Sequence, residues 1–430
     1  MRRSRLFGLA GLAVLAFWGA EGCKKKDQEQ PTGAATAPDS GEPGATTEPA
    51  AQPTTPAADA EPTEPAQPTE PEKPALAEVT LKTAPTAEEQ QAAQELAAKL
   101  ADLAQREAEL GKPEQARLFL VLAASGKTEP PTIGAALLGL AYSWKEDAEA
   151  AFLEDYRAVV AARLGATEPE VLGPALKAAK KAVASTDPID PALVQALLAL
   201  VARPDDPAAP YEALDVLGSG KKVLEAAGTK DAFLAAFGST HPHVAATALT
   251  TFAWLASGTI PDAEAYRAKI EELLKHADPA VRGEACGALA EFVPFGDAEA
   301  AVPIAKLLLP LLDDENPFVR SRAASSLADI KYKPAIHAFV KHLDDPAPNT
   351  YDTPSWKTLE GNDGWDHHDG SAWSRVDDAM LRAIQSITFF DDVKFEYQVN
   401  VGSVEADLAA AVEAAKAWYE AHKADIPPLE

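Results

Sequence analysis

The chain has almost no cysteine. Its 430 residues include two, Cys23 and Cys286. Two cysteines allow at most one disulfide, so a scaffold built on disulfides is excluded. Cys286 lies among small apolar residues that recur along the chain, which favours a buried, inert thiol over a reactive one. The fold must therefore depend on a hydrophobic core.

Positive charge is also scarce. Lysine and arginine total 39 against 66 aspartates and glutamates, which gives a formal net charge of −27. Binding to nucleic acid needs a basic surface that neutralises phosphates, so this balance argues against a nucleic-acid partner. The chain contains no HExxH, GxSxG or CxxC motif and no complete phosphate-binding loop. We therefore predict neither enzyme activity nor a cofactor.

No apolar run reaches the length of a membrane-spanning helix. The longest, residues 6–19, follows three arginines and precedes the sequence Ala-Glu-Gly-Cys that ends at Cys23. This arrangement predicts a cleaved signal peptide over residues 1–23. The Gly-Cys pair resembles the bacterial lipobox, although Ala20 and Glu21 depart from it, and the resemblance implies lipidation of Cys23. Ordinary secretion and an uncleaved anchor remain alternatives.

Residues 24–85 contain no aromatic residue and few large aliphatic ones. Proline, threonine, glutamate, alanine and glutamine dominate this segment. A segment of this composition cannot bury enough apolar surface to offset the entropy of ordering it. We predict a disordered linker over residues 24–85 that holds the following domain away from the membrane.

Helical structure is predicted from Thr86, because Thr86 and Glu89 form a capping-box pattern. Gly111 is expected to end this first helix and Pro113 to begin the next. The pair is predicted to form an N-terminal helical hairpin cap over residues 86–130. Its first helix should bury one face of leucines, at Leu96, Leu100, Leu103 and Leu110.

Beyond the hairpin, one helix motif recurs at a nearly constant spacing. An apolar anchor is followed by small or apolar residues four, five, seven and eight positions later, with steps of 38, 38, 35, 37, 38 and 57 residues. A fixed period of this length is typical of stacked helical repeats. The anchors are Ile133, Val171, Ala209, Val244, Val281, Val319 and Val376.

The clearest two units are residues 278–289 and 316–327, which share an Asp/Asn-Pro-x-Val-Arg start and an Ala-rich continuation. This pattern resembles the HEAT-repeat family in its short bacterial form, over roughly residues 130–425. The resemblance implies an all-α fold, a right-handed α-solenoid of stacked antiparallel helix pairs. It also implies ladders between neighbouring units, at positions that Asp278, Arg282 and Arg320 match. The second helix of each unit is leucine-rich, as in residues 270–274, 304–312 and 336–343.

The last step is about 20 residues too long for the period. We therefore predict repeats over residues 131–346, a loop insertion over 347–375, and a C-terminal repeat and cap over 376–430. Alternation between Val393 and Val401 suggests a short strand before the last helix.

The predicted insertion holds the candidate site residues. Its aromatic side chains could bind a partner, and its clustered acids and histidines could bind a divalent metal. A third possibility is that the tryptophans pack the loop onto the solenoid. The partner-binding candidates are Tyr351, Trp356, Trp365 and Trp373, and the metal candidates are Asp363, Asp366, His367, His368 and Asp369.

These observations predict a lipid-anchored protein of the bacterial envelope, facing the periplasm or exposed at the surface. It would bind a protein or peptide along the concave face of the solenoid, aided by the 347–375 loop. A glycan- or cell-wall-binding module that uses the aromatic loop is the alternative. HEAT-like units also resemble those of bilin lyases, so a lyase-like enzyme is a third reading, although no catalytic constellation supports it.

Overall fold

The computed structural model describes residues 76–145, 148–185, 190–203, 207–220, 222–256, 260–349, 359, 375–396 and 405–429. The predicted signal peptide, Cys23 and residues 24–75 of the predicted linker lie outside this part. Within it, every regular element is helical, with seventeen α-helices and several short 3-10 turns. The all-α prediction is therefore confirmed. None of these helices combines the length and apolar character needed to span a bilayer.

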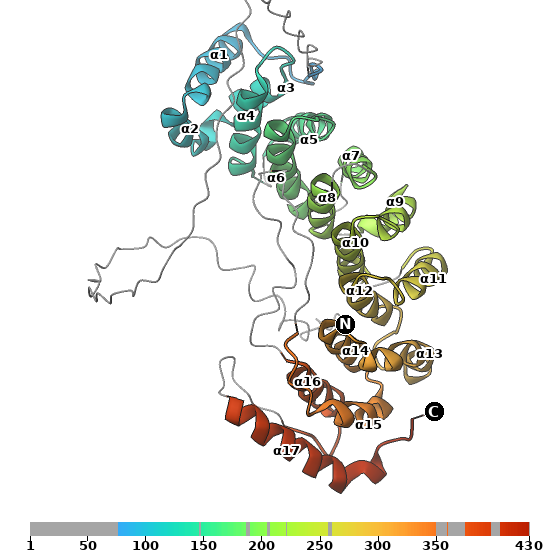
Figure 1. Ribbon diagram of the computed structural model, residues 1–430. Coiled ribbons are helices and arrows are strands. Elements are labelled where there is room, and N and C mark those ends of the chain that lie inside the picture. The colour runs from blue at the N-terminus through green and yellow to red at the C-terminus, as the bar shows by residue number, and fades with distance from the viewer. Residues whose placement is uncertain are drawn as a thin grey trace, which may run out of the picture. The chain divides into compact units, whose positions relative to one another are not determined.

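Most helices fall into two rows (Figure 1). The anchor row carries the predicted anchors and consists of α4 (Pro130–Tyr142), α6 (Pro169–Ser185), α8 (Ala208–Gly218), α10 (Pro242–Leu255), α12 (Pro279–Ala290), α14 (Pro317–Asp329) and α16 (Val376–Thr388). The companion row consists of α3 (Ala116–Ala124), α5 (Ala150–Arg163), α7 (Pro191–Val201), α9 (Thr229–Phe237), α11 (Ala263–Leu273), α13 (Ala298–Leu308) and α15 (Ile336–Phe339). The terminal helices are α1 (Ala87–Ala101), α2 (Leu103–Leu110) and α17 (Glu405–His422).

Packing follows chain order. Each anchor helix packs against the next one, from α4 through α16, and the companion helices from α3 to α11 do the same. Helices far apart in this order have no extensive contact with each other within the described residues. This is the arrangement of an α-solenoid, in which each unit buries its apolar side only against its neighbours.

The anchor motif is the core of each unit. In α12, Val281 and the four motif positions after it, Ala285, Cys286, Ala288 and Leu289, are all fully buried. Offsets of four, five, seven and eight residues place these side chains on one side of a helix. The buried thiol of Cys286 fits this pattern, and burial raises its pKa to about 12. The prediction that Cys286 is a buried core residue is therefore confirmed.

Small residues let neighbouring anchor helices approach closely. A Cβ atom on Gly134 would lie 1.9 Å from the carbonyl oxygen of Glu170 on the next anchor helix. A Cβ atom on Gly283 would lie 2.3 Å from the ring of Phe318, again on the next anchor helix. Glycine is required at both positions because any side chain would force the two helices apart.

The order of the two helices within each repeat differs from the prediction. Of its two flanking companion helices, each anchor helix packs mainly against the one that precedes it in the chain. Thus α7 pairs with α8, and α11 pairs with α12. The leucine-rich helix is therefore the first of each unit, not the second. Sequence spacing fixes the period of a repeat but cannot say where one unit ends, because that depends on which helices pack most closely.

The N-terminal hairpin is only partly as predicted, because its second helix, α3, packs against α4 and α5 as the first companion helix. Thr86 and Glu89 form the reciprocal capping box at the start of α1, and the helical segment ends at Gly111. The prediction of a continuous leucine face is wrong, however, because the first helix is interrupted at Asp102. The Asp102 side chain caps a second helix by accepting from the amide of Ala104. This break turns Leu103 outward, where it is 75% exposed, while Leu96, Leu100 and Leu110 are buried.

The predicted linker ends earlier than expected. Residues 76–85 were assigned to it, yet Leu81 is buried and Val79 donates a backbone hydrogen bond to Ala124 at the end of α3, at 2.9 Å. Three aliphatic residues, Leu76, Val79 and Leu81, pack this segment against the core. The segment is therefore part of the solenoid, although its composition resembles that of the linker.

The predicted insertion enters at the start of α16. Its two ends meet in an antiparallel bridge between Pro348 and Arg375, and the amide of Val376 donates to Ala347 at 3.0 Å. The anchor helix α16 begins at Val376 as predicted, and α17 closes the chain where the last helix was expected. Residues 393–396 form no strand, and the rest of the predicted strand lies outside the described residues.

Candidate interaction surface

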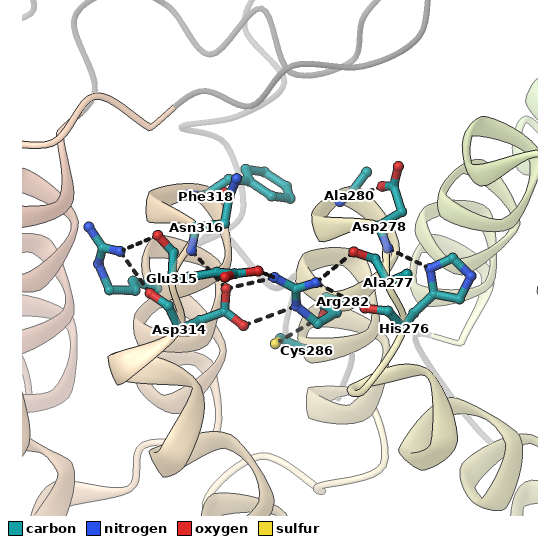
Figure 2. A network of polar contacts seen from close by, with 11 residues as sticks. His276, Ala277, Asp278, Ala280, Arg282, Cys286, Asp314, Glu315, Asn316 and Phe318 are labelled. Carbon is teal, nitrogen blue, oxygen red and sulfur yellow. Dashed lines mark hydrogen bonds and ion pairs between the residues drawn. The ribbon is translucent and has the colours of Figure 1, made fainter.

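Polar contacts at the starts of the anchor helices join three successive units. Arg282 of α12 forms a bidentate ion pair with Asp314, with Nη2 2.8 Å from Oδ1 and Nε 3.0 Å from Oδ2 (Figure 2). Its Nη1 donates back to the carbonyl oxygens of His276 and Ala277, at 2.9 and 3.0 Å. The guanidinium thus connects the end of one unit to the beginning of the next.

The same arrangement repeats one unit later. Arg320 of α14 pairs with Asp345 at 2.8 Å, and its Nη1 donates to the carbonyl oxygen of Asp314 at 2.7 Å. We call these contacts the arginine ladder, defined by Arg282, Asp314, Arg320 and Asp345. The predicted roles of Arg282 and Arg320 are confirmed.

Asp278 does not belong to the arginine ladder. Its side chain caps α12 by accepting from the amide of Ala280 at 2.8 Å, and Asn316 caps α14 in the same way. The acceptors in the ladder are Asp314, two residues before the cap residue Asn316, and Asp345, which lies just before the predicted insertion. An aspartate next to a proline is a strong N-cap signal, so its side chain is already occupied.

The exposed side of the anchor row is defined by the residues that lie three and six positions after each anchor. We call it the anchor face. Six positions after the anchors lie mainly exposed residues, and three positions after them lie Glu212, Glu284 and Arg322. Offset six lies on the opposite side of the helix from the buried motif, whereas offset three lies at the boundary between the buried and the exposed side. The exposed members at offset six are Lys177, Asp215, Thr250, Ser325 and Arg382.

A charge pair crosses this face between two units. Glu284 of α12 is 3% exposed, and its Oε2 lies 2.5 Å from Nη2 of Arg322 on α14. Gly287 makes room for the arginine, because a Cβ atom there would lie 2.8 Å from the same nitrogen. The carboxylate of Glu284 raises the pKa of Arg322. The pair therefore joins two successive anchor helices through a buried carboxylate and a partly exposed guanidinium.

One residue of the predicted insertion contacts the anchor face. The amide of Leu359 donates to Oε1 of Glu212 on α8 at 3.1 Å, and the Leu359 side chain packs against the core. The two residues are separated by 147 positions in the chain. Glu212 occupies the same offset, three residues after its anchor, as Glu284 and Arg322 do. A carboxylate on α8 thus accepts a peptide N–H from a distant segment of the chain.

Sequence reasoning missed a set of exposed aromatic side chains. They lie at or just after the C-terminal ends of anchor helices, which run in the same direction one repeat apart and therefore end on one side of the stack. The available signal was an aromatic residue that falls outside the buried motif. These residues are Tyr142, Trp254, Phe295, Phe389 and Phe390. Separate exposed aromatics of this kind can serve as anchors for a partner.

The predicted site residues of the insertion are not placed by the structure. Tyr351, Trp356, Trp365 and Trp373 lie outside the described residues, as do the metal candidates Asp363, Asp366, His367, His368 and Asp369. Among the residues that are described, no three His, Cys, Asp or Glu side chains gather as metal ligands would. The partner-binding and metal-binding assignments of this loop stay predictions.

The segment with the arginine ladder has a recognised sequence signature. Residues 266–351 match the family model of HEAT repeats. This segment runs from α11 to the beginning of the insertion. No curated protein matches the chain.

Several solved structures of helical proteins are similar to this chain. Kap121p bound to Nup53p matches at 14% identity, covers 78% of this chain and 37% of its own, and gives a TM-score of 0.49. An engineered protein matches at 20% identity over 78% of this chain and 92% of its own, with a TM-score of 0.39. A designed armadillo repeat protein matches at 18% identity over 51% and 99%, with a TM-score of 0.35. At these identities nothing about activity or partners follows for this chain.

Proposed function

We propose that this protein is a lipid-anchored scaffold of the bacterial envelope that binds a protein or peptide partner along the anchor face. The observation that carries the proposal is the contact of Leu359 with α8, where Glu212 accepts a backbone N–H at 3.1 Å. A side-chain acceptor for a backbone N–H at this position suits an extended peptide segment. Because the anchor helices all run in the same direction, the position that Glu212 occupies on α8 recurs along the row.

The charge arrangement adds specificity to this surface. Lys180 of α6 and Asp215 of α8 pair at 2.6 Å with both side chains about half exposed, and the partly exposed guanidinium of Arg322 is held in place by the buried carboxylate of Glu284. Charges placed in register along a surface favour one orientation of a partner over the other and reject partners of the wrong pattern. The exposed aromatic side chains at the helix ends, including Trp254, supply apolar contacts at the edge of the same face.

The binding proposal can be tested with a photoreactive amino acid placed at single positions in cells. Thr250 and Ser325 are exposed and lie at offset six on the anchor face, whereas Glu272 and Glu299 are exposed on the companion helices α11 and α13. We expect one discrete protein adduct from the two anchor-face positions and none from the two controls. Adducts of equal yield from both rows, or none from the anchor face, would overturn the proposal. Binding to purified peptidoglycan in place of a protein adduct would favour the glycan-binding alternative.

The membrane anchor is a separate part of the proposal and has its own test. The chain has two cysteines, so each can be changed with the other as a control. We expect Cys23→Ser to move the protein from the membrane fraction to the soluble fraction and to remove the lipid mass. Cys286→Ser should leave both unchanged, since Cys286 is buried in α12. Unchanged fractionation of the Cys23→Ser variant would rule out lipid anchoring at this residue.

A further inference from the structure

The segment before α1 is held to the solenoid by side chains of two companion helices. We call residues 76–83 the strap. It has no helical structure, and the amide of Val79 donates to the carbonyl oxygen of Ala124 at 2.9 Å. Within the strap, the side chain of Leu81 is buried. Gly126 lies directly against the strap, because a Cβ atom there would come within 2.6 Å of the carbonyl oxygen of Leu76.

One end of the strap is fixed by a buried carboxylate. Asp155 of α5 is 1% exposed and accepts from the amide of Lys82 at 2.6 Å and from that of Thr83 at 3.4 Å. Arg117 of α3 lies 3.5 Å from the same carboxylate and also donates to the carbonyl oxygen of Thr83. Hydrogen bonds to a charged acceptor are stronger than those between neutral groups. Lys82 and Thr83 are therefore held by both companion helices.

The other end is fixed by a buried arginine. Arg163 of α5 is 2% exposed and makes no ion pair among the described residues; its guanidinium donates to backbone carbonyl oxygens. Nε and Nη2 donate to Ala123 and Ala124 at the end of α3, at 2.7 and 3.0 Å, and Nη1 donates to Ala77 of the strap at 2.8 Å. A cation at a helix C-terminus is favourable because it meets the free carbonyls and the helix dipole. The same group thus joins the strap to α3.

We propose that the strap transfers tension from the chain before residue 76 to α3 and α5, so that pulling on that chain does not unwind α1. The strap precedes α1 in the chain, and its contacts with α3 and α5 come before Thr86, where α1 is capped. A pull from the N-terminal side therefore meets the contacts of Ala77 and Val79 first. Without them, the force would act directly on α1, a terminal helix whose main contacts within the described residues are with α2, α3 and α4.

This role rests on the proposed membrane anchor, which would supply the tension. The docking of the strap does not depend on the anchor and can be measured on the purified full chain. The two ideas therefore fail separately. Loss of membrane attachment on Cys23→Ser tests the anchor, and the experiments below test the strap.

Hydrogen exchange with mass spectrometry tests the docking. We expect peptides covering residues 76–83 to exchange at least about tenfold faster in Asp155→Asn than in the wild type, because a charged acceptor for two amides is lost. The matched control is Glu154→Gln, since Glu154 contacts only the Lys82 side chain at an exposed site and should change exchange less than about twofold. Val79→Pro removes a donor from the strap itself and leaves the helices untouched, so it covers the case in which Asp155→Asn misfolds. Equal exchange in all variants, or free-chain exchange in the wild type, would overturn the proposal.

Single-molecule pulling tests the transfer of tension. With handles at both ends of the full chain, the wild type should give an early event that releases about eight residues, or roughly 28 Å at about 3.5 Å per residue. In Val79→Pro this event should be absent, and α1 should detach at a lower force than in the wild type. Detachment of α1 at the same force in both proteins would show that the strap bears no tension.

Discussion

The two ends of the anchor row are joined by different interactions. Between α12 and α16, the arginine ladder links successive units through largely buried ion pairs, and both side chains of the Arg282–Asp314 pair are 10% exposed. Between α6 and α8, an ion pair at a different position of the repeat, Lys180 with Asp215, has side chains 50% and 56% exposed. A buried bidentate pair is strongly directional, whereas an exposed lysine pair is weakened by solvent and salt.

Close helix packing occurs in both regions, because Gly283 lies against Phe318 between α12 and α14 just as Gly134 does against Glu170 between α4 and α6, so the arginine ladder is an additional interaction of the later anchor helices. Gly134 lets α4 lie against the carbonyl oxygen of Glu170 on α6, and Gly139 lets the ring of Phe119 approach α4. Contact at this distance gives dispersion energy along the whole helix, but it tolerates no added atom. One solenoid is therefore stabilised by both means, which differ in their sensitivity to substitution. The first two of the four predictions below test this difference.

The largest effect is expected from breaking the arginine ladder. Arg282→Ala leaves Asp314 buried without its partner, and removing one member of such a pair costs about 3–5 kcal/mol. Urea unfolding followed by circular dichroism measures the loss. The matched variant in the first units, Lys180→Ala, should cost only about 0–1 kcal/mol, since both partners are half exposed. Equal losses for the two variants would contradict the distinction between the two ends.

The next effect is expected from adding one carbon at a close helix contact. Gly134→Ala puts a Cβ where the nearest atom is 1.9 Å away, and overpacking of this kind costs about 1–3 kcal/mol. Gly173 of α6 is the control, because a Cβ there meets nothing within 4 Å. Gly173→Ala should instead stabilise the helix by about 0.5–1 kcal/mol. Thermal melting of both variants would reveal the opposite signs, and a destabilised Gly173→Ala would show that packing does not control this end.

A smaller effect is expected from shortening the insertion. Replacing residues 350–373 by two glycines keeps the Pro348–Arg375 bridge and the Asp345 acceptor of the arginine ladder. The lost Leu359 contact is one hydrogen bond, worth about 1 kcal/mol, so the melting temperature should fall by no more than about 4 °C. Removing residues 347–375 entirely should cost more, because Ala347 and Arg375 bond within the repeat. Equal losses for the two deletions would show that the bridge has no structural role.

The smallest effect concerns acid stability at the N-terminal cap. Hydrogen bonds from Lys112 and Gln115 hold the pKa of Glu109 below its ordinary value. A carboxyl with a lowered pKa stabilises the folded state above its unfolded pKa, and this stability is lost as the pH falls through the folded pKa. Wild-type protein should therefore melt above Glu109→Gln at about pH 6, and the difference should shrink at about pH 3. A difference that is constant with pH would exclude this charge effect.

The sequence predicts the architecture well because burial in a stacked repeat is periodic. The motif after Val281 is fully buried as expected, and the start of α16 at Val376 is correct despite the long insertion. The pairing of helices was not predictable, because both helices flanking an anchor helix are apolar and only their packing distinguishes them. The break at Asp102 was also missed, since a good N-cap residue can interrupt a leucine pattern without disturbing its spacing.

The candidate surface was predicted less completely than the fold. The position of the insertion follows from the broken period, and the structure places its ends together at residues 348 and 375. The contact between Leu359 and Glu212 joins residues 147 positions apart, so no local pattern could indicate it. The strap was missed for a related reason, because its few apolar residues become significant only when Asp155 and Arg163 are brought beside them.

The bridge between Pro348 and Arg375 has a practical consequence. Because the chain leaves and re-enters the solenoid at adjacent positions, extra sequence placed between them does not need to change the spacing of α14 and α16. Domain insertions succeed at sites of this kind, where the two junctions are close together. A fluorescent protein or a small binding domain grafted here would sit on an otherwise intact stack and report on this molecule in living cells.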